Sequence, residues 1–174
     1  MKRGCMVLAL GVLTGSVQAA TITYDFTASG GYTGVFVYND TATPYATEQV
    51  GGGTAAFYDA ISYSVNGLNY SNPVLAIFHD DGGQDSALFE TTSNSPALEL
   101  NAPEGLFSST SANVMDGRTL SNFPSNSYFA PSLGGATYGV ISLTEVSAVP
   151  LPAAAWLLLS GLGGLGLLGR KRAV

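Results

Sequence analysis

The fold of this chain is decided by residues 61–71, which read Ile61-Ser62-Tyr63-Ser64-Val65-Asn66-Gly67-Leu68-Asn69-Tyr70-Ser71. Apolar and small polar residues alternate on both sides of Asn66-Gly67, and a period of two is typical of a strand with one buried face. Asn-Gly is a preferred pair for a type I′ turn, because both residues tolerate positive φ. The predicted cross-strand pairs are Val65 with Leu68 and Tyr63 with Tyr70, and the apolar face consists of Ile61, Tyr63, Val65, Leu68 and Tyr70. Turn chemistry and periodicity therefore predict the same β-hairpin.

Short alternating runs of the same kind recur through residues 20–148, and no sustained helical periodicity interrupts them. The candidate strands are Ile22–Thr27, Gly34–Tyr38, Thr54–Tyr58, Ile61–Val65, Leu68–Ser71, Val74–His79, Ala87–Thr91, Ala97–Leu100 and Tyr138–Val146. A second hairpin is expected around the turn Asp80–Asp85, and residues 102–136, rich in Ser, Asn and Pro, are expected to form long loops. Regular short strands separated by turn residues predict an all-β domain, an antiparallel β-sandwich or jelly roll.

The charges of the 174-residue chain are segregated along the sequence. Five of the six basic residues lie at the two ends and Arg118 is the sixth, whereas all twelve acids lie between Asp25 and Glu145. The middle therefore carries 12 − 1 = 11 net negative charges and no lysine. Nucleic-acid binding needs a basic footprint, so this composition argues against it.

Residues 1–19 have the features of a secretory signal peptide. Lys2 and Arg3 precede an apolar run from Cys5 to Val17, and Val17 and Ala19 supply small residues at positions −3 and −1 of a cleavage site after Ala19. The Sec machinery and signal peptidase are the expected partners of this segment. Because Cys5 is the only cysteine, the exported domain would contain no disulfide and no thiolate metal ligand.

The C-terminal end has the features of a single transmembrane helix. Residues 151–169 carry no charge and are followed by Arg170-Lys171-Arg172. A helix of that length would be about 28 Å long, close to the ~30 Å hydrocarbon core of a bilayer. The positive-inside rule would hold the basic tail 170–172 in the cytoplasm, which agrees with an N-terminus exported by Sec.

The same end resembles a known sorting signal. Val149-Pro150-Leu151-Pro152-Ala153, an apolar helix and Arg170-Lys171-Arg172 occur in the order and spacing of the PEP-CTERM sorting domain in its VPLPA variant, with Leu151 where the eponymous motif has Glu. The resemblance implies that residues 149–174 are recognised by an exosortase, a membrane-embedded enzyme of Gram-negative bacteria. It also implies cleavage near the proline motif and delivery to the cell surface or extracellular matrix, in an exopolysaccharide or biofilm context. The sorting and processing residues would be Ala19, Val149, Pro150, Leu151, Pro152, Ala153, Arg170, Lys171 and Arg172.

Catalytic residue types are scarce between the two ends. His79 is the only histidine, no Gly-x-Ser-x-Gly motif is present, and the domain has no Cys, no Lys and one Arg. Glycoside hydrolysis needs only two carboxylates and stays open, although no spacing selects a pair. We therefore expect no catalytic residue and a protein that is not an enzyme.

One acidic turn is a candidate calcium site. Asp80, Asp81 and Asp85 could supply the oxygen ligands that calcium prefers, but the spacing of an EF-hand is absent. The alternative is a hairpin turn with solvated carboxylates. No cofactor is expected otherwise.

Nine tyrosines suggest a further class of function, because a tyrosine ring can stack on a sugar. Stacking would require a row of exposed tyrosines on one sheet face, whereas the alternative is a role in core packing. The two readings differ in the exposure of these side chains.

The leading hypothesis is a non-enzymatic, exported protein of the cell surface or extracellular matrix. It divides into a signal peptide (1–19), a secreted β-domain (20–148) and a sorting signal (149–174). The alternatives are a carbohydrate-binding module of that matrix, a permanently membrane-anchored periplasmic protein, and a small hydrolase with two facing carboxylates in a concave site.

Overall fold

A computed structural model of the chain describes residues 20–146. The predicted signal peptide, the proline motif, the apolar C-terminal segment and the basic tail lie outside the described residues. None of the helices within residues 20–146 is long and apolar enough to cross a membrane.

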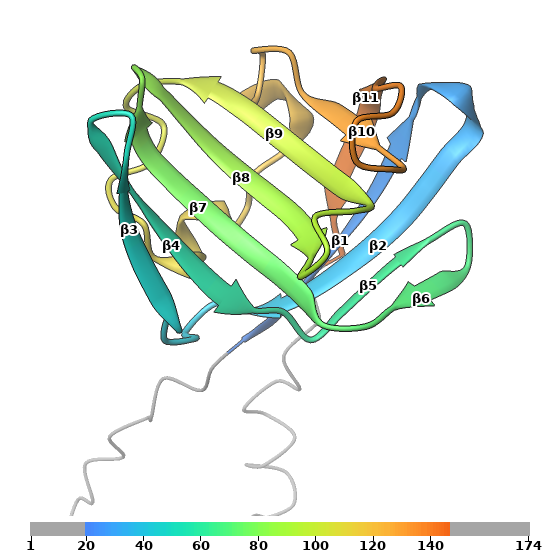
Figure 1. Cartoon of the computed structure of the whole chain (residues 1–174), viewed down its shortest axis with the longest axis horizontal. Helices are drawn as coiled ribbons and strands as arrows, with labels where there is room; N and C mark the ends of the chain where they lie inside the picture. Colours follow the sequence, from blue (N-terminus) through green and yellow to red (C-terminus); the bar gives the residue numbers. More distant parts are fainter. Residues whose placement is uncertain (1–19, 147–174) are drawn as a thin grey trace, which may run out of the picture.

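The described chain forms one curled antiparallel sheet of eleven strands (Figure 1). The strands are β1 (Thr21–Ala28), β2 (Tyr32–Asn39), β3 (Ala46–Val50), β4 (Gly53–Asp59), β5 (Ser62–Val65), β6 (Leu68–Tyr70), β7 (Pro73–Asp81), β8 (Gln84–Thr91), β9 (Ala97–Pro103), β10 (Tyr128–Ala130) and β11 (Tyr138–Glu145). The short 3₁₀ helices are η1 (Ser29–Gly31), η2 (Ala112–Met115) and η3 (Leu120–Asn122). The order of strands across the sheet is β3-β4-β7-β8-β9-β10-β11-β1-β2-β5-β6.

The core lies inside the curl, between the half that contains β4, β7, β8 and β9 and the half that contains β1, β2 and β5. Alternate residues of β1, β2 and β8 are buried, as in β1, where Ile22, Tyr24, Phe26 and Ala28 point inward. Phe36 of β2 stacks on Phe89 of β8 with ring centroids 3.4 Å apart. Four strands lie between β8 and β2 in the sheet order, so this contact joins the two halves directly.

The all-β antiparallel prediction is confirmed, and each of the nine predicted strands corresponds to a strand of the structure. The register of the first hairpin is confirmed, with Val65 opposite Leu68 and Tyr63 opposite Tyr70. Asn66 and Gly67 have φ values of 49° and 78°, as the type I′ turn requires.

The burial expected on that hairpin is wrong at its two ends. Tyr63 and Val65 are buried, but Leu68 is 66% exposed and Ile61 is 57% exposed. Leu68 is on β6, the last strand of the sheet, and Ile61 lies just before the start of β5. The alternating pattern records which face a residue is on, but not whether another strand covers that face.

Two strands and one turn were not predicted. β3 is an edge strand without apolar alternation, and β10 has three residues within a Ser- and Pro-rich stretch. The predicted six-residue turn Asp80–Asp85 is a two-residue turn at Gly82-Gly83, because Asp81 pairs with Gln84. Between Phe78 and Asp81 the ladder contains a bulge, and Asp80 has a φ of 60° there.

The predicted long loops are confirmed for residues 104–127, but the segment is packed rather than exposed. Five of its apolar side chains are buried, namely Phe107, Ala112, Val114, Met115 and Phe123. Hydroxyl groups of the core tyrosines hold its backbone: Tyr24 donates to the carbonyl of Met115 (2.5 Å) and Tyr58 to that of Thr110 (2.6 Å). The Arg118 guanidinium donates to the carbonyls of Val114 and Leu106.

A matched pair of glycine substitutions tests the turn. A Cβ at Gly67 and a Cβ at Gly139 would each meet open space, but only Gly67 has a positive φ. We expect Gly67→Val to lower the free energy of unfolding by about 1–2 kcal/mol, because a branched side chain disfavours the left-handed conformation, and Gly139→Val to change it by less. Urea unfolding measures both. Equal effects of the two substitutions would contradict the turn geometry.

Candidate functional site

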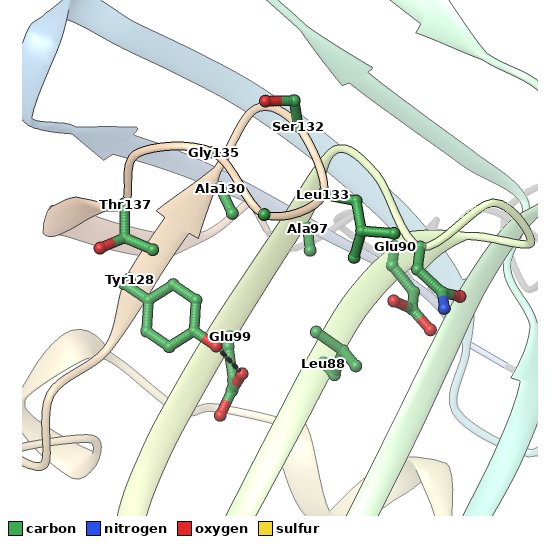
Figure 2. Close-up of a pocket in the computed structure, with 12 residues that line it drawn as sticks. Leu88, Glu90, Ala97, Glu99, Tyr128, Ala130, Ser132, Leu133, Gly135 and Thr137 are labelled. Carbon is green, nitrogen blue, oxygen red and sulfur yellow. Dashed lines mark hydrogen bonds between the residues drawn. The ribbon is translucent and has the colours of Figure 1, made fainter.

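A cleft lies on the outer face of the sheet, over β8, β9 and β10 and beneath the loop that joins β10 to β11 (Figure 2). Its volume is about 370 Å³. The residues that line it are Leu88, Glu90, Asn94, Ala97, Glu99, Tyr128, Ala130, Ser132, Leu133, Gly134, Gly135 and Thr137. Ala97 and Ala130 are opposite one another on β9 and β10, and their small side chains leave room between the sheet and the loop.

Two carboxylates from neighbouring strands face this cleft. Glu99 on β9 lies between Leu88 of β8 and Tyr128 of β10 in the ladder, and Glu90 is two residues beyond Leu88. The Tyr128 hydroxyl donates a short hydrogen bond to Oε2 of Glu99 (Figure 2). The Glu90 carboxylate has no hydrogen-bond donor within residues 20–146.

The pKa values of Tyr128 and Glu90 are both raised, and the nearby carboxylate of Glu99 contributes to each shift. The hydrogen bond to Glu99 raises the pKa of Tyr128 to about 12, since it favours the protonated phenol. Burial, and after it the charge of Glu99, raises the pKa of Glu90. No basic residue lines the cleft to offset these charges. Arg118, the one basic residue of Lys or Arg type in the described part of the chain, binds backbone carbonyls elsewhere.

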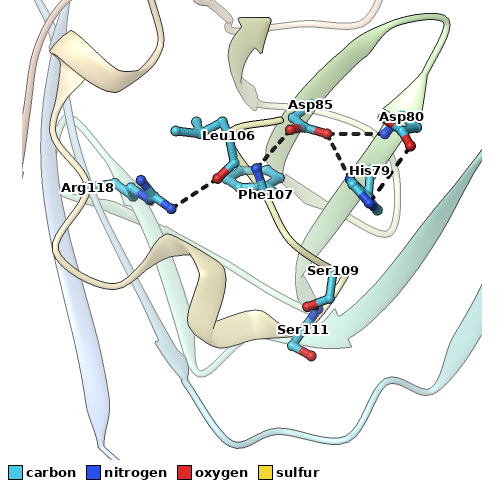
Figure 3. A network of polar contacts seen from close by, with 8 residues as sticks. All are labelled: His79, Asp80, Asp85, Leu106, Phe107, Ser109, Ser111 and Arg118. Atoms are coloured by element: carbon cyan, nitrogen blue, oxygen red, sulfur yellow. Dashed lines mark hydrogen bonds and ion pairs between the residues drawn. The ribbon is translucent and has the colours of Figure 1, made fainter. Parts of the chain in front are cut away.

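A second polar cluster lies where β7 and β8 meet the start of the packed segment (Figure 3). The Asp85 carboxylate is fully buried. Its Oδ1 accepts from the backbone N–H of Asp80 (3.1 Å) and lies 3.1 Å from Nδ1 of His79, and its Oδ2 accepts from the backbone N–H of Phe107 (2.8 Å). When Asp85 is ionised it can only accept, so Nδ1 of His79 carries the hydrogen.

The balance of forces on Asp85 favours its charged form. Burial by itself raises the pKa of this carboxyl, but the hydrogen bonds from Phe107, His79 and Asp80 outweigh burial and lower it below the usual value. The bond to Phe107 crosses 22 residues of sequence. Asp85 therefore fixes the packed segment to the sheet.

The three predicted calcium ligands are not brought together as a set. Asp80 and Asp85 lie close to His79, and one ligand atom of each lies within 4.8 Å of the others. Asp81 is not in this group; it continues the ladder and pairs with Gln84. At the bulge, the backbone N–H of Asp80 donates to Asp85, and the Asp80 carboxylate lies 3.9 Å from Nε2 of His79. Sequence spacing alone does not show that Asp80 and Asp81 differ in this way.

Most tyrosines belong to the core rather than to an exposed row. Tyr24, Tyr38, Tyr58 and Tyr63 are buried, and among all nine, which lie within residues 20–146, only Tyr45 is classed as exposed. A sugar-binding surface built from a row of exposed tyrosines is therefore not present on the described domain. Tyr128 acts instead as a polar wall of the cleft.

Glu90 and Glu99 are the site residues that sequence analysis did not find. Glu90 lies between the buried residues Phe89 and Thr91 of β8. Glu99 lies between the buried residues Leu98 and Leu100 of β9. The alternation predicts that they face outward, but the pairing of β8 with β9 and the loop above them come only from the structure. Both line one concave site, on the same face of adjacent strands, whereas the hydrolase alternative requires two carboxylates that face each other across such a site.

Comparison of the chain with protein-family models, with curated proteins and with solved structures gives no match.

Asp85 offers a direct test of the second cluster. We expect Asp85→Asn to lower the free energy of unfolding at pH 7 by about 2–3 kcal/mol, because charge-assisted hydrogen bonds to a buried group are lost. Asp81→Asn is the matched control and should change it little. A carboxyl with a lowered folded pKa stabilises the fold above its unfolded pKa and loses that contribution as pH falls through the folded pKa. The difference between wild type and Asp85→Asn should therefore shrink in acid; a difference that is constant down to pH 2 would contradict the assignment.

Proposed function

We propose that this chain is a non-enzymatic protein of the cell surface or extracellular matrix, exported by Sec and sorted by an exosortase through residues 149–172. The signal peptide with its cleavage site after Ala19 and the C-terminal VPLPA-type signal carry the proposal. In architecture we class the secreted domain as a β-sandwich whose two halves share β10 and β11.

The position of the two ends of the domain supports this proposal. β1 and β11 are antiparallel neighbours, and the backbone N–H of Val146 donates to the carbonyl of Thr23 (2.8 Å). The described chain therefore begins and ends at the same end of the domain, on two neighbouring strands inside the sheet (Figure 1). A domain held by a C-terminal anchor would present all its other surfaces away from the membrane, both before and after removal of the signal peptide.

The composition of the domain supports export as well. Residues 20–146 contain no cysteine, and the fold is held by an aromatic core and by tyrosine hydroxyls. Such a domain needs no oxidation step after export. Asp85 holds the packed segment and His79 hydrogen-bonds Asp85, which supports a structural role for the sole histidine.

The test is the intact mass of the protein recovered from its native host. We expect a mass that lacks residues 1–19 and the residues beyond the proline motif. Replacing Arg170, Lys171 and Arg172 by Asn should reduce the C-terminal processing, because the tail would no longer be held in the cytoplasm. Replacing Pro150 and Pro152 by Ala should also reduce the C-terminal processing, because the exosortase would no longer recognise the motif.

Two outcomes would contradict the proposal. A mature protein that retains residues 151–174 would favour the permanently anchored periplasmic protein. Unchanged mass and yield in the variant without both prolines would show that the motif is not the recognition element.

A further inference from the structure

We propose that the cleft over β8, β9 and β10 binds an amine-bearing saccharide unit, with Glu90 and Glu99 as the groups that receive its ammonium. This inference concerns the domain itself and does not depend on how the chain is sorted.

The first argument is electrostatic. Two carboxylates line one hollow as diagonal neighbours on adjacent strands, because Leu88 is the residue opposite Glu99, and the charge of Glu99 disfavours the ionised form of Glu90. No basic side chain lines the cleft, and Glu90 has no hydrogen-bond donor among residues 20–146. A ligand that brings a positive charge with several N–H donors would satisfy Glu90 and offset the repulsion between the two groups.

The second argument is the chemistry of the walls. Leu88, Leu133, Ala97 and Ala130 provide apolar surface, while the remaining polar side chains are hydroxyls and one amide, from Ser132, Thr137, Tyr128 and Asn94. A sugar ring presents C–H faces and hydroxyl groups together, so it matches both kinds of wall. An ammonium on that ring matches the carboxylates.

The third argument is size. A volume of about 370 Å³ is at the lower end of the range of small-molecule sites, roughly 300–1,000 Å³. This is more space than a single metal ion fills. Calcium takes about six to eight oxygen ligands, whereas four of the side chains that line this cleft are apolar and supply none.

Tyr128 is a positioning residue in this account. Its hydroxyl donates to Oε2 of Glu99 and fixes that carboxylate on the cleft side of β9. Tyr128→Phe keeps the ring and removes the hydrogen bond, so we expect weaker binding of the amine-bearing sugar. Binding of a neutral sugar would change less, because only the ammonium depends on Glu99.

The experiment is calorimetric titration of the exported chain in a detergent that has no sugar headgroup. The probes are a tetramer of β-1,4-linked glucosamine, its fully N-acetylated form, the corresponding glucose tetramer, a pentalysine peptide and calcium chloride. We expect the glucosamine tetramer to bind at least about tenfold more tightly than the two uncharged tetramers, which corresponds to about 1.4 kcal/mol. Its affinity should also fall as salt is added.

Two matched variants locate the site. Glu90→Gln and Glu99→Gln should each weaken binding of the glucosamine tetramer by about tenfold or more, since each removes a charge-assisted contact. Glu48→Gln on the exposed edge strand β3 is the control and should bind like wild type. At pH 7 the melting temperature of Glu90→Gln should equal or exceed that of wild type, because a like-charge neighbour is removed; this shows that the loss of binding is not a loss of folding.

Each of the following results would overturn the proposal. Equal affinity for the glucosamine and N-acetylated tetramers would show that the ammonium is not recognised. Unchanged binding of the glucosamine tetramer by Glu90→Gln would show that the sugar does not bind in the cleft. Pentalysine binding as tightly as the sugar would assign the cleft to a basic peptide. Calcium that displaces the sugar and depends on Glu90 would make it a cation site, and cleavage of the tetramer would make it a hydrolase.

Discussion

The stacking of Phe36 on Phe89 is the contact on which the rest of the structure depends. It joins β2 to β8 across the interior, although four strands separate them in the sheet order. Tyr24 and Tyr38 extend the same aromatic layer on the β2 side. Because residues 20–146 contain no cysteine, no disulfide can hold the curl closed, and core packing must do so.

The outer cleft follows from this inner packing. Since side chains alternate across a strand, burying Phe89 and Leu98 places Glu90 and Glu99 on the opposite face of β8 and β9. The loop after β10 then rises over two alanines and encloses the space beside them. The packing of the core therefore places two carboxylates in one cleft at the surface. No Lys or Arg of the described domain lines that cleft to offset their charge.

Sequence predicted the fold better than the site, and the reason is physical. Period-two alternation and the Asn66-Gly67 turn are local, so nine strands and one register could be predicted from neighbouring residues alone. Glu90 and Glu99 become neighbours only through strand pairing, and the backbone N–H of Asp80 donates to Asp85 at a bulge in the ladder between Phe78 and Asp81. Edge strand β3 lacks the buried face that makes a strand recognisable. The sorting signals that we propose at the two ends are linear motifs, and for that reason they are predicted without a fold.

The central claim, that contact between the two halves of the sheet holds the domain together, is tested most directly by a double-mutant cycle on Phe36 and Phe89. The free energy of unfolding is measured for wild type, Phe36→Leu, Phe89→Leu and the double variant. Leucine keeps both positions apolar and removes the ring contact. A coupling energy of about 0.5–1.5 kcal/mol is predicted, as for aromatic pairs in direct contact. Strictly additive effects of the two substitutions would contradict the account.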